Sequence, residues 1–259
     1  MIRNGVERLG GRTISAISEL GRFARFGGWI VGGLLRPPFR PRRIVREAYD
    51  SGVLSLAIVC ASGLAVGLVL SLQLYNVLVR FGAEESLGAV IGLTLIRELG
   101  PVLTGLLVTG RAGSAMTAEI GMMVATEQID GMRTMAVDPM KFVVVPKAIA
   151  LTLSMPLLSA LFIVASIFGG YLVGVQLLGL ETGTYFGSLE NAVEFRTDVV
   201  GSALKALLFG ALVALIATFR GFTTGRSTAE VSASTTATVV TGSVCILLAD
   251  YIFTALWGF

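Results

Sequence analysis

Five long stretches with few or no charged residues dominate the chain. They cover residues 53–79, 86–110, 146–178, 199–219 and 239–259. Because an α-helix rises 1.5 Å per residue, about 20 apolar residues cross the ~30 Å hydrocarbon core of a bilayer. The pattern therefore predicts an all-α membrane protein whose five transmembrane helices form one domain, residues 51–259. The third stretch contains Pro156 and is too long for one upright helix, which predicts a kinked or tilted span.

The region before the first span, residues 1–50, is amphipathic and basic. Apolar residues recur at near-helical spacing through residues 1–25, with Arg and Glu between them, which predicts an interfacial helix on the membrane surface. Residues 26–35 are apolar but too few to cross a bilayer, and Trp29 is a typical interfacial anchor. The Arg- and Pro-rich run 36–43 predicts a break before the first span.

Charge is sparse and unevenly distributed. Only 14% of residues are charged, against about 25% in soluble domains. With five spans, 16 of the 20 Lys and Arg residues fall on the side of the N-terminus, whereas the opposite loops, 80–86 and 181–198, hold two basic and six acidic residues. This asymmetry predicts a cytoplasmic N-terminus and a C-terminus on the other side. The basic N-terminal region favours anionic lipid over nucleic acid, so we expect no nucleic-acid partner.

The sequence offers little chemistry of its own. Histidine is absent, and Cys60 and Cys245 both lie in apolar runs, so we expect no metal site and no disulfide framework. A phosphate-binding loop of the form GxxxxGK[ST] is also missing. We therefore expect no catalytic residues and no cofactor, and the chain cannot hydrolyse ATP through such a loop.

Two charged residues interrupt the second span. Arg97 and Glu98 are costly in hydrocarbon, at least about 2.5–3.5 kcal/mol for the worst residue types. Pro101 adds to the polarity, because it cannot donate a hydrogen bond to the carbonyl of Arg97, which then needs another partner. Either these groups line a substrate cavity, or they form structural ion pairs that lock helices together. Lys205 is expected to snorkel to the outer interface, and Asp250 to bond a neighbouring helix.

The first span carries two stripes. Gly63, Gly67 and Ser71 recur every four residues and predict close packing of another helix. Leu70, Leu74 and Leu78 form a second stripe, followed by Phe81. These leucines either face lipid or the protein core, or they form a wall for an acyl chain.

The segment between the second and third spans, residues 114–136, is too polar to cross a membrane and too apolar for a free loop. Ser114 is a suitable N-cap for a helix that begins there, and Pro139 a suitable stop. Its methionines suggest an adaptable docking surface for a partner protein. The alternative is an interfacial helix that lies against lipid. The residues that we assign to docking are Glu119, Met123, Glu127 and Asp130.

Several motifs resemble one known family. They are LIRELGP at 95–101, GRAGSAMTAEIG at 110–121, EQID at 127–130, MAVDP at 135–139, NAVEFRTD at 191–198 and ADYIFTA at 249–255. Together they closely resemble the MlaE/YrbE family of ABC transporter permeases, and the resemblance covers nearly the whole chain.

The resemblance implies a function and a set of partners. Such permeases are homodimers in the bacterial cell inner membrane, with a periplasmic C-terminus, and they move phospholipids between inner and outer membranes. A separate ABC ATPase grips the coupling helix after the second span, here residues 114–136. A periplasmic MCE-domain lipid-binding protein, and often a STAS-domain protein, complete the complex.

The resemblance also implies a substrate site. The family's lipid cavity opens at the dimer interface, with an Arg-Glu pair at its base that matches Arg97 and Glu98. Leucines of its upper part match Leu70 and Leu78, and Phe81 stands where some relatives carry another aromatic residue. The main alternative is a stand-alone secondary transporter or channel with Arg97, Glu98 and Asp250 as a relay. A membrane-embedded enzyme and a structural scaffold are further alternatives.

Overall fold

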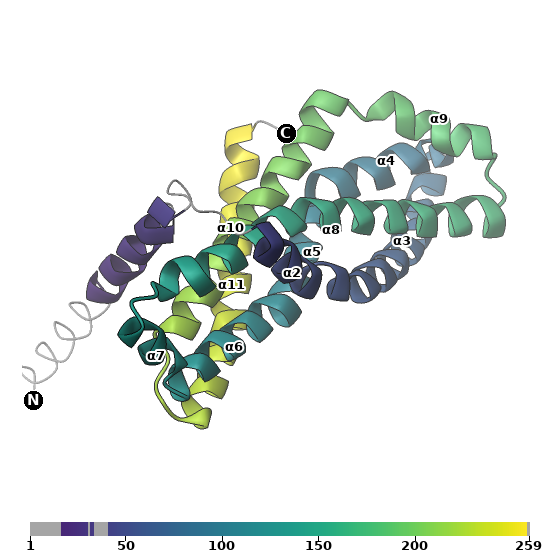
Figure 1. Cartoon of the computed structure of the whole chain (residues 1–259). Helices are drawn as coiled ribbons and strands as arrows, with labels where there is room; N and C mark the ends of the chain where they lie inside the picture. Colours follow the sequence, from purple (N-terminus) through teal and green to yellow (C-terminus); the bar gives the residue numbers. More distant parts are fainter. Residues whose placement is uncertain (1–16, 31, 34–40, 258–259) are drawn as a thin grey trace, which may run out of the picture.

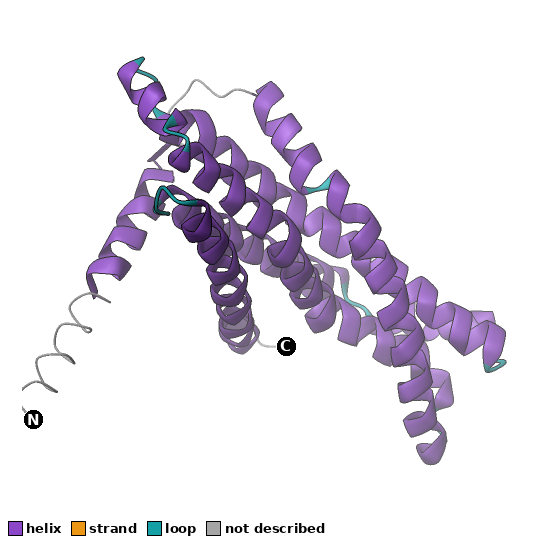
Figure 2. Cartoon of the chain, turned by 90° about the horizontal axis from the view of Figure 1, so that it is seen from below, coloured by secondary structure: helices purple, strands orange, loops and turns teal. Residues whose placement is uncertain are grey.

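The protein is a helical bundle with five helices long and apolar enough to cross a membrane. The computed structural model describes residues 17–30, 32–33 and 41–257, and within these residues all regular secondary structure is helical (Figures 1 and 2). The five candidate spans are Pro41–Phe81, Glu84–Ala125, Met140–Leu177, Phe195–Phe222 and Thr228–Trp257. The all-α, five-span prediction is therefore confirmed, although each span is longer than its apolar core.

The first span begins before its hydrophobic stretch. Helix α2 (Pro41–Ser51) leads through a short 3-10 turn into α3 (Leu56–Leu78). The proline suits the first turn, where its missing N–H would have no helical partner. Gly82 ends the span with φ +63°, a left-handed conformation that glycine adopts without steric cost.

The second span runs on into the predicted coupling segment without a break. It comprises α4 (Leu87–Thr94), a π-helical turn Leu95–Leu99, α5 (Gly100–Val108), a second π-helical turn Thr109–Gly113 and α6 (Ser114–Ala125). The prediction that a new helix begins at Ser114 is wrong. Its hydroxyl donates to the carbonyl of Gly110 one turn back, as serine does inside a helix.

The chain first turns beyond α6. Glu127 has φ +59°, which is uncommon for a residue with a side chain, and it precedes the short helix α7 (Gln128–Thr134). The coupling segment predicted at 114–136 is thus the end of the second span plus a separate turn of helix.

The third, fourth and fifth spans also differ from their predicted bounds. Helix α8 (Val145–Tyr171) continues through Pro156, between π-helical segments Met140–Val144 and Leu172–Leu177. The external segment predicted as a loop contains α9 (Thr182–Ala192). Helix α10 (Val200–Phe222) follows a π-helical turn, and α11 (Thr228–Trp257) begins well before residue 239. Ser and Thr in the first turns of α11 accept helical geometry because their hydroxyls bond nearby backbone carbonyls.

Small residues allow α3 and α8 to pack closely, as predicted. A Cβ added to Gly67 would lie 1.9 Å from the carbonyl oxygen of Ser166, so only glycine fits there. The hydroxyl of Ser166 donates to Gly63, and that of Ser71 donates to Gly170. Helix α8 lies between α3 and α10 near the middle of the bundle (Figure 1).

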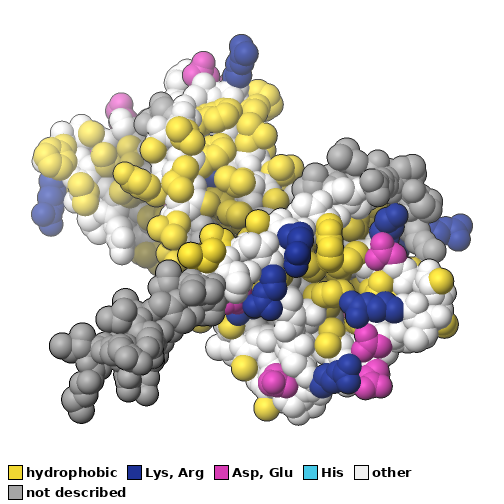
Figure 3. Space-filling model, turned by 90° about the vertical axis from the view of Figure 1, so that its left-hand side faces the viewer, with side chains coloured by type: hydrophobic (Ala, Val, Ile, Leu, Met, Phe, Trp, Pro, Cys, Tyr) yellow, Lys and Arg dark blue, Asp and Glu magenta, His cyan; other side chains and the backbone are white. Residues whose placement is uncertain are grey.

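The two spans at the ends of the membrane domain are the least covered. Each span contains a hydrophobic stretch of 18 residues. In the first span 22% of that stretch is buried and in the last span 11%, against 44–50% in the other three. Hydrophobic side chains form continuous areas on the surface, and many charged side chains gather apart from them (Figure 3).

Residues 17–30 form an N-terminal helix that passes the boundary expected at residue 25. Phe23 and Phe26 pack edge-on against Phe219 of α10, at ring-centroid distances of 5.2 and 5.5 Å. Trp29 is 59% exposed. The part of the predicted interfacial helix before residue 17 lies outside the described residues.

Candidate functional site

A buried lysine organises the polar groups inside the membrane domain. Lys205 of α10 is fully buried, and its ammonium donates to Glu98 Oε2, to Thr254 Oγ1 and to the carbonyl of Arg97, each at 2.9 Å. Asp250 of α11 lies 2.9 Å from the same ammonium. The cluster thus joins the second, fourth and fifth spans.

The predicted role of Pro101 is confirmed by this geometry. Pro101 has no N–H to donate to the carbonyl of Arg97, and the Lys205 ammonium donates to that carbonyl instead. The expectation that Lys205 snorkels to the interface is wrong, because four oxygen-bearing groups, two of them carboxylates, hold its ammonium inside the bundle. Asp250 bonds a neighbouring helix, as expected.

A second ion pair flanks the lysine cluster. Arg97 Nε donates to Asp198 Oδ1 at 2.8 Å, and Asp198 has no exposed surface. The other carboxylate oxygen accepts the backbone N–H of Glu194 at 2.8 Å. The sequence placed Asp198 in an external loop and missed it. A signal was present, since an arginine inside an apolar span needs a carboxylate at its own depth.

The polar cluster is buried on one side only. Lys205 and Asp198 are inaccessible, whereas the side chains of Arg97, Glu98 and Asp250 are 34%, 37% and 21% exposed. Charged groups are costly where they meet hydrocarbon. In a single copy, the partly exposed side chains of Arg97, Glu98 and Asp250 therefore lie on the surface of apolar spans. Either a water-filled cavity or another protein surface has to shield them from hydrocarbon.

The apolar residues assigned to the substrate site lie on a different helix, outside the polar network. Leu70 and Leu78 of α3 are half-buried and pack against the helical core. Phe81 follows α3 and is 79% exposed. Within one copy, the structure brings Arg97 and Glu98 together with Lys205 but does not join them to these three residues.

The residues assigned to docking have partners within the chain. Glu119 of α6 pairs with Lys147 of α8 at 2.7 Å, and Glu47 of α2 reaches the same ammonium at 2.6 Å. Lys147 is only 3% exposed, so this second buried lysine joins α2, α6 and α8. Sequence reasoning did not single out Lys147 or Glu47.

The end of the coupling segment is held by an arginine from a distant loop. Arg226, between α10 and α11, lies 3.2 Å from both Glu127 and Asp130. Met123 is half-buried against the core, whereas its neighbour Met122 is 43% exposed. Among the described residues, no group of three or more His, Cys, Asp and Glu side chains is arranged to hold a metal ion.

Known proteins match this chain over most of its length. A family model described as "Permease MlaE" matches residues 44–256. The chain is 44% identical to the intermembrane phospholipid transport system permease protein MlaE of Haemophilus influenzae, over 99% of this chain and 98% of the relative. It is 38% identical to a probable ABC transporter permease protein of Rickettsia bellii, over 99% of both chains.

A plant relative matches more distantly. The chain is 30% identical to the chloroplastic protein TRIGALACTOSYLDIACYLGLYCEROL 1 of Arabidopsis thaliana, over 88% of this chain and 65% of the relative. The family model covers all five spans and the polar cluster between them. This chain is therefore a multi-pass membrane protein that belongs to the MlaE permease family.

Proposed function

We propose that this chain is the membrane-spanning permease subunit of an ABC transporter that moves phospholipids between the inner and outer membranes of a bacterium. Family membership and the 44% identity to the phospholipid transport permease of Haemophilus influenzae support this function. The permease itself is non-catalytic and binds no cofactor. A separate ATPase subunit binds and hydrolyses ATP.

The observation that carries the proposal is the half-exposed charge at Arg97 and Glu98 inside an apolar span. Two copies of the chain, facing each other, enclose these groups in a polar-based cavity at the dimer interface. The sparsely covered first and last spans supply the apolar surface for such an assembly.

In this cavity, the two parts of a phospholipid meet different surfaces. Acyl chains contact Leu70, Leu78 and Phe81, which belong to the first span and the turn after it. Arg97 and Glu98 supply polarity at depth, and the Lys205 cluster holds both in position. Because Glu98 shares its cation with Asp250, movement of the last span changes the charge balance of the cavity.

Coupling to the ATPase occurs through α6 and α7. The ATPase binds a surface that includes Glu119, Met123, Glu127 and Asp130. The exposed side chains of Met122 and Met135 lie beside it. Since α6 continues the second span, a push on its cytosolic end is transmitted directly to Arg97 and Glu98. The pairs with Arg226 carry the same motion to α10 and α11.

The remaining partners follow from the same assignment. The homodimer sits in the inner membrane with its N-termini in the cytoplasm and its C-termini in the periplasm. A periplasmic MCE-domain protein exchanges phospholipid with the cavity, and a STAS-domain protein binds the ATPase.

Reconstitution tests this function. The complex purified from native membranes is placed in vesicles, and transfer of a fluorescent phospholipid to its MCE-domain partner is followed with ATP and with a non-hydrolysable analogue. We expect transfer only with ATP. Transfer by the permease alone under an ion gradient, without ATP, would instead support a secondary transporter that uses Arg97, Glu98 and Asp250.

Two substitutions separate the cavity from the coupling surface. Glu98→Gln should alter the phospholipid recovered with the complex, whereas Met123→Arg should reduce the amount of ATPase that co-purifies. Arg80→Gln, at an exposed external position, is the control for both. Unchanged lipid in the first variant would make Glu98 purely structural, and an unchanged complex in the second would refute the coupling role.

A further inference from the structure

A hollow separates the N-terminal helix from the start of the third span, and the residues of the Lys205 cluster do not line it. It comprises two pockets, a polar mouth of about 520 Å³ and an apolar groove of about 430 Å³, whose linings come within one helical turn of each other at Gly28 and Gly27 and at Val145 and Ile149. On one side the two pockets are lined by residues 27–30, 32 and 33. On the other side the mouth is lined by residues between 138 and 145, and the groove by residues of α8 and α10. Their volumes lie within the range of ligand pockets, ~300–1,000 Å³.

The apolar groove lies between α8 and α10. Ile30 of the N-terminal helix faces Ile149 and Leu153 of α8 and Leu207 and Leu215 of α10. The two α10 residues are eight positions apart, about 12 Å of helix, which approaches the ~15 Å depth of one leaflet. The groove is therefore long enough for most of an acyl chain.

Small side chains keep the groove open. Gly27, Ala148, Ala211 and Ala214 line it where larger residues would fill it. Thr152 also lines it, but its hydroxyl donates to the carbonyl of Ala148 at 2.8 Å and so leaves the methyl group for apolar contact. The lining is accordingly apolar in effect throughout.

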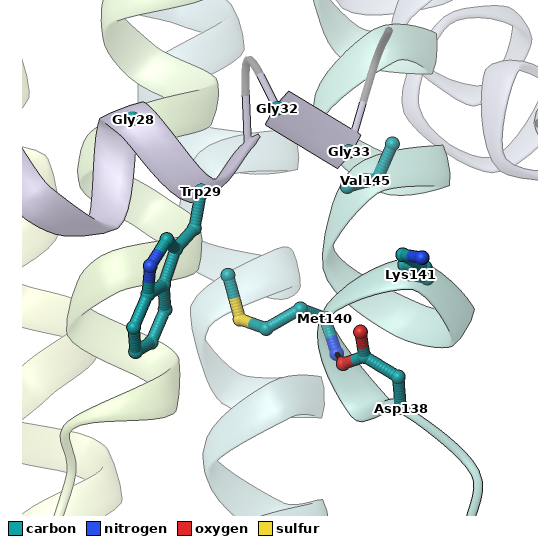
Figure 4. A pocket seen from close by; sticks show the side chains of 8 residues that line it. All are labelled: Gly28, Trp29, Gly32, Gly33, Asp138, Met140, Lys141 and Val145. Atoms are coloured by element: carbon teal, nitrogen blue, oxygen red, sulfur yellow. Dashed lines mark hydrogen bonds between the residues drawn. The ribbon is translucent and has the colours of Figure 1, made fainter. Parts of the chain in front are cut away.

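The polar mouth has a different character. Trp29 descends from the N-terminal helix and faces Met140, while Asp138 and Lys141 lie at the start of the third span beside it (Figure 4). One Asp138 oxygen accepts the backbone N–H of Met140, and no ion pair joins Lys141 to another described residue. The mouth thus offers one cation, one carboxylate and an indole of the kind found at membrane interfaces.

Glycines keep the mouth open as well. A Cβ added to Gly28 or Gly32 would meet no atom within 4 Å, so these positions border empty space. Gly33 instead approaches Val145 so closely that a Cβ would lie 2.7 Å from its methyl group. The N-terminal region therefore touches the third span at Gly33 and leaves open space at Gly28 and Gly32.

We infer that this hollow binds one zwitterionic glycerophospholipid of the cytoplasmic leaflet, at a site separate from the cavity of the dimer interface. The lipid phosphate lies against Lys141 and its ammonium against Asp138, while an acyl chain fills the groove beside Leu153 and Leu207. Charge complementarity at the mouth, joined to an apolar groove of leaflet length, selects this occupant. The leaflet assignment rests on the cytoplasmic N-terminus of the proposed function.

Photolabelling tests the site directly. The complex is placed in vesicles that contain a phosphatidylethanolamine with a diazirine near the end of one acyl chain, irradiated, and digested for mass spectrometry. We expect labelled peptides to contain Ile149, Leu153 or Leu207 in excess over Leu157 and Val164, which are exposed elsewhere on α8. Equal labelling of all exposed positions would mean ordinary surrounding lipid and overturn the proposal.

Competition by unlabelled lipid tests the headgroup without any variant. Phosphatidylethanolamine should compete with the label about tenfold better than phosphatidylglycerol, whose headgroup lacks the ammonium that Asp138 would accept. Equal competition, or stronger competition by phosphatidylglycerol, would refute the zwitterionic site.

Two matched variants locate the binding. Ala211→Phe, which fills the groove, should reduce labelling of the site about tenfold or more, whereas Ala203→Phe, at an exposed position two turns away on α10, should not. Equal labelling of the two variants would argue against the groove. ATP-dependent lipid transfer is measured in parallel: its absence in the unmodified complex, with site labelling intact, would refute the proposed function and leave this site standing.

Discussion

Replacing Lys205 by methionine perturbs the centre of the polar cluster while keeping most of the side-chain volume. The substitution removes the cation that lies 2.9 Å from both Glu98 and Asp250. It also removes the donor to the carbonyl of Arg97. Two carboxylates then face each other without a neutralising charge.

The magnitude follows from the burial of the lysine. Breaking a buried ion pair by removing one partner costs about 3–5 kcal/mol. Lys205 is fully buried, but Glu98 and Asp250 are partly exposed, which places the loss near the lower end of that range. At about 2–4 °C per kcal/mol for a domain of roughly this size, Lys205→Met should lower the Tm by at least about 6 °C.

The assay is thermal unfolding of the detergent-solubilised complex, followed by size-exclusion chromatography after heating. Arg80→Met, at an exposed external position, is the matched control and should shift the Tm by little. Adding Glu98→Gln and Asp250→Asn to Lys205→Met should recover much of the loss, because a buried cluster replaced as a whole by neutral groups costs little. A Tm of Lys205→Met equal to that of the control, or no recovery in the triple variant, would refute the argument.

Three further predictions concern packing, surface charge and pH. Gly67→Ala should destabilise the protein by about 1–3 kcal/mol, since its Cβ meets the backbone of Ser166, whereas Gly187→Ala, with no atom nearby, should not; thermal unfolding compares the two. Arg226→Ala should cost no more than about 1 kcal/mol in the same assay, because its ion pairs are exposed, and a larger loss would contradict this. Burial raises the pKa of Tyr185 from 10.0 to about 12, so its contribution to stability is present below pH 10 and is lost as the pH rises toward 12. Denaturant unfolding across that range should show a steeper decline for the unmodified protein than for Tyr185→Phe, and equal slopes would disprove the link.

Some features of this protein follow from local patterns in the chain. The number of spans and their all-α character are confirmed, because each hydrophobic run has to satisfy its own backbone hydrogen bonds inside the bilayer. The close packing of α3 on α8 also followed from Gly63, Gly67 and Ser71, since small residues on one face permit helices to approach. The need of the Arg97 carbonyl for a partner followed from Pro101 alone.

Other features depended on residues that are far apart in sequence. Glu98 and Lys205 are separated by 107 positions, and Arg97 and Asp198 by 101. A local pattern shows that each charge is costly in a membrane, but it does not show which partner neutralises it. For this reason Lys205 was expected at the interface, and neither Asp198 nor Lys147 was assigned a role.

The limits of the helices were likewise decided by tertiary contacts. Polar residues at 109–114 and 228–238 suggested ends of helices, yet both segments are helical, because neighbouring helices and backbone carbonyls satisfy their hydroxyl groups. Sequence alone therefore determined how often the chain crosses the membrane, since that depends on the length of each apolar run. Only the folded bundle decided which charges meet and where each helix stops, since those outcomes depend on the groups that packing brings together.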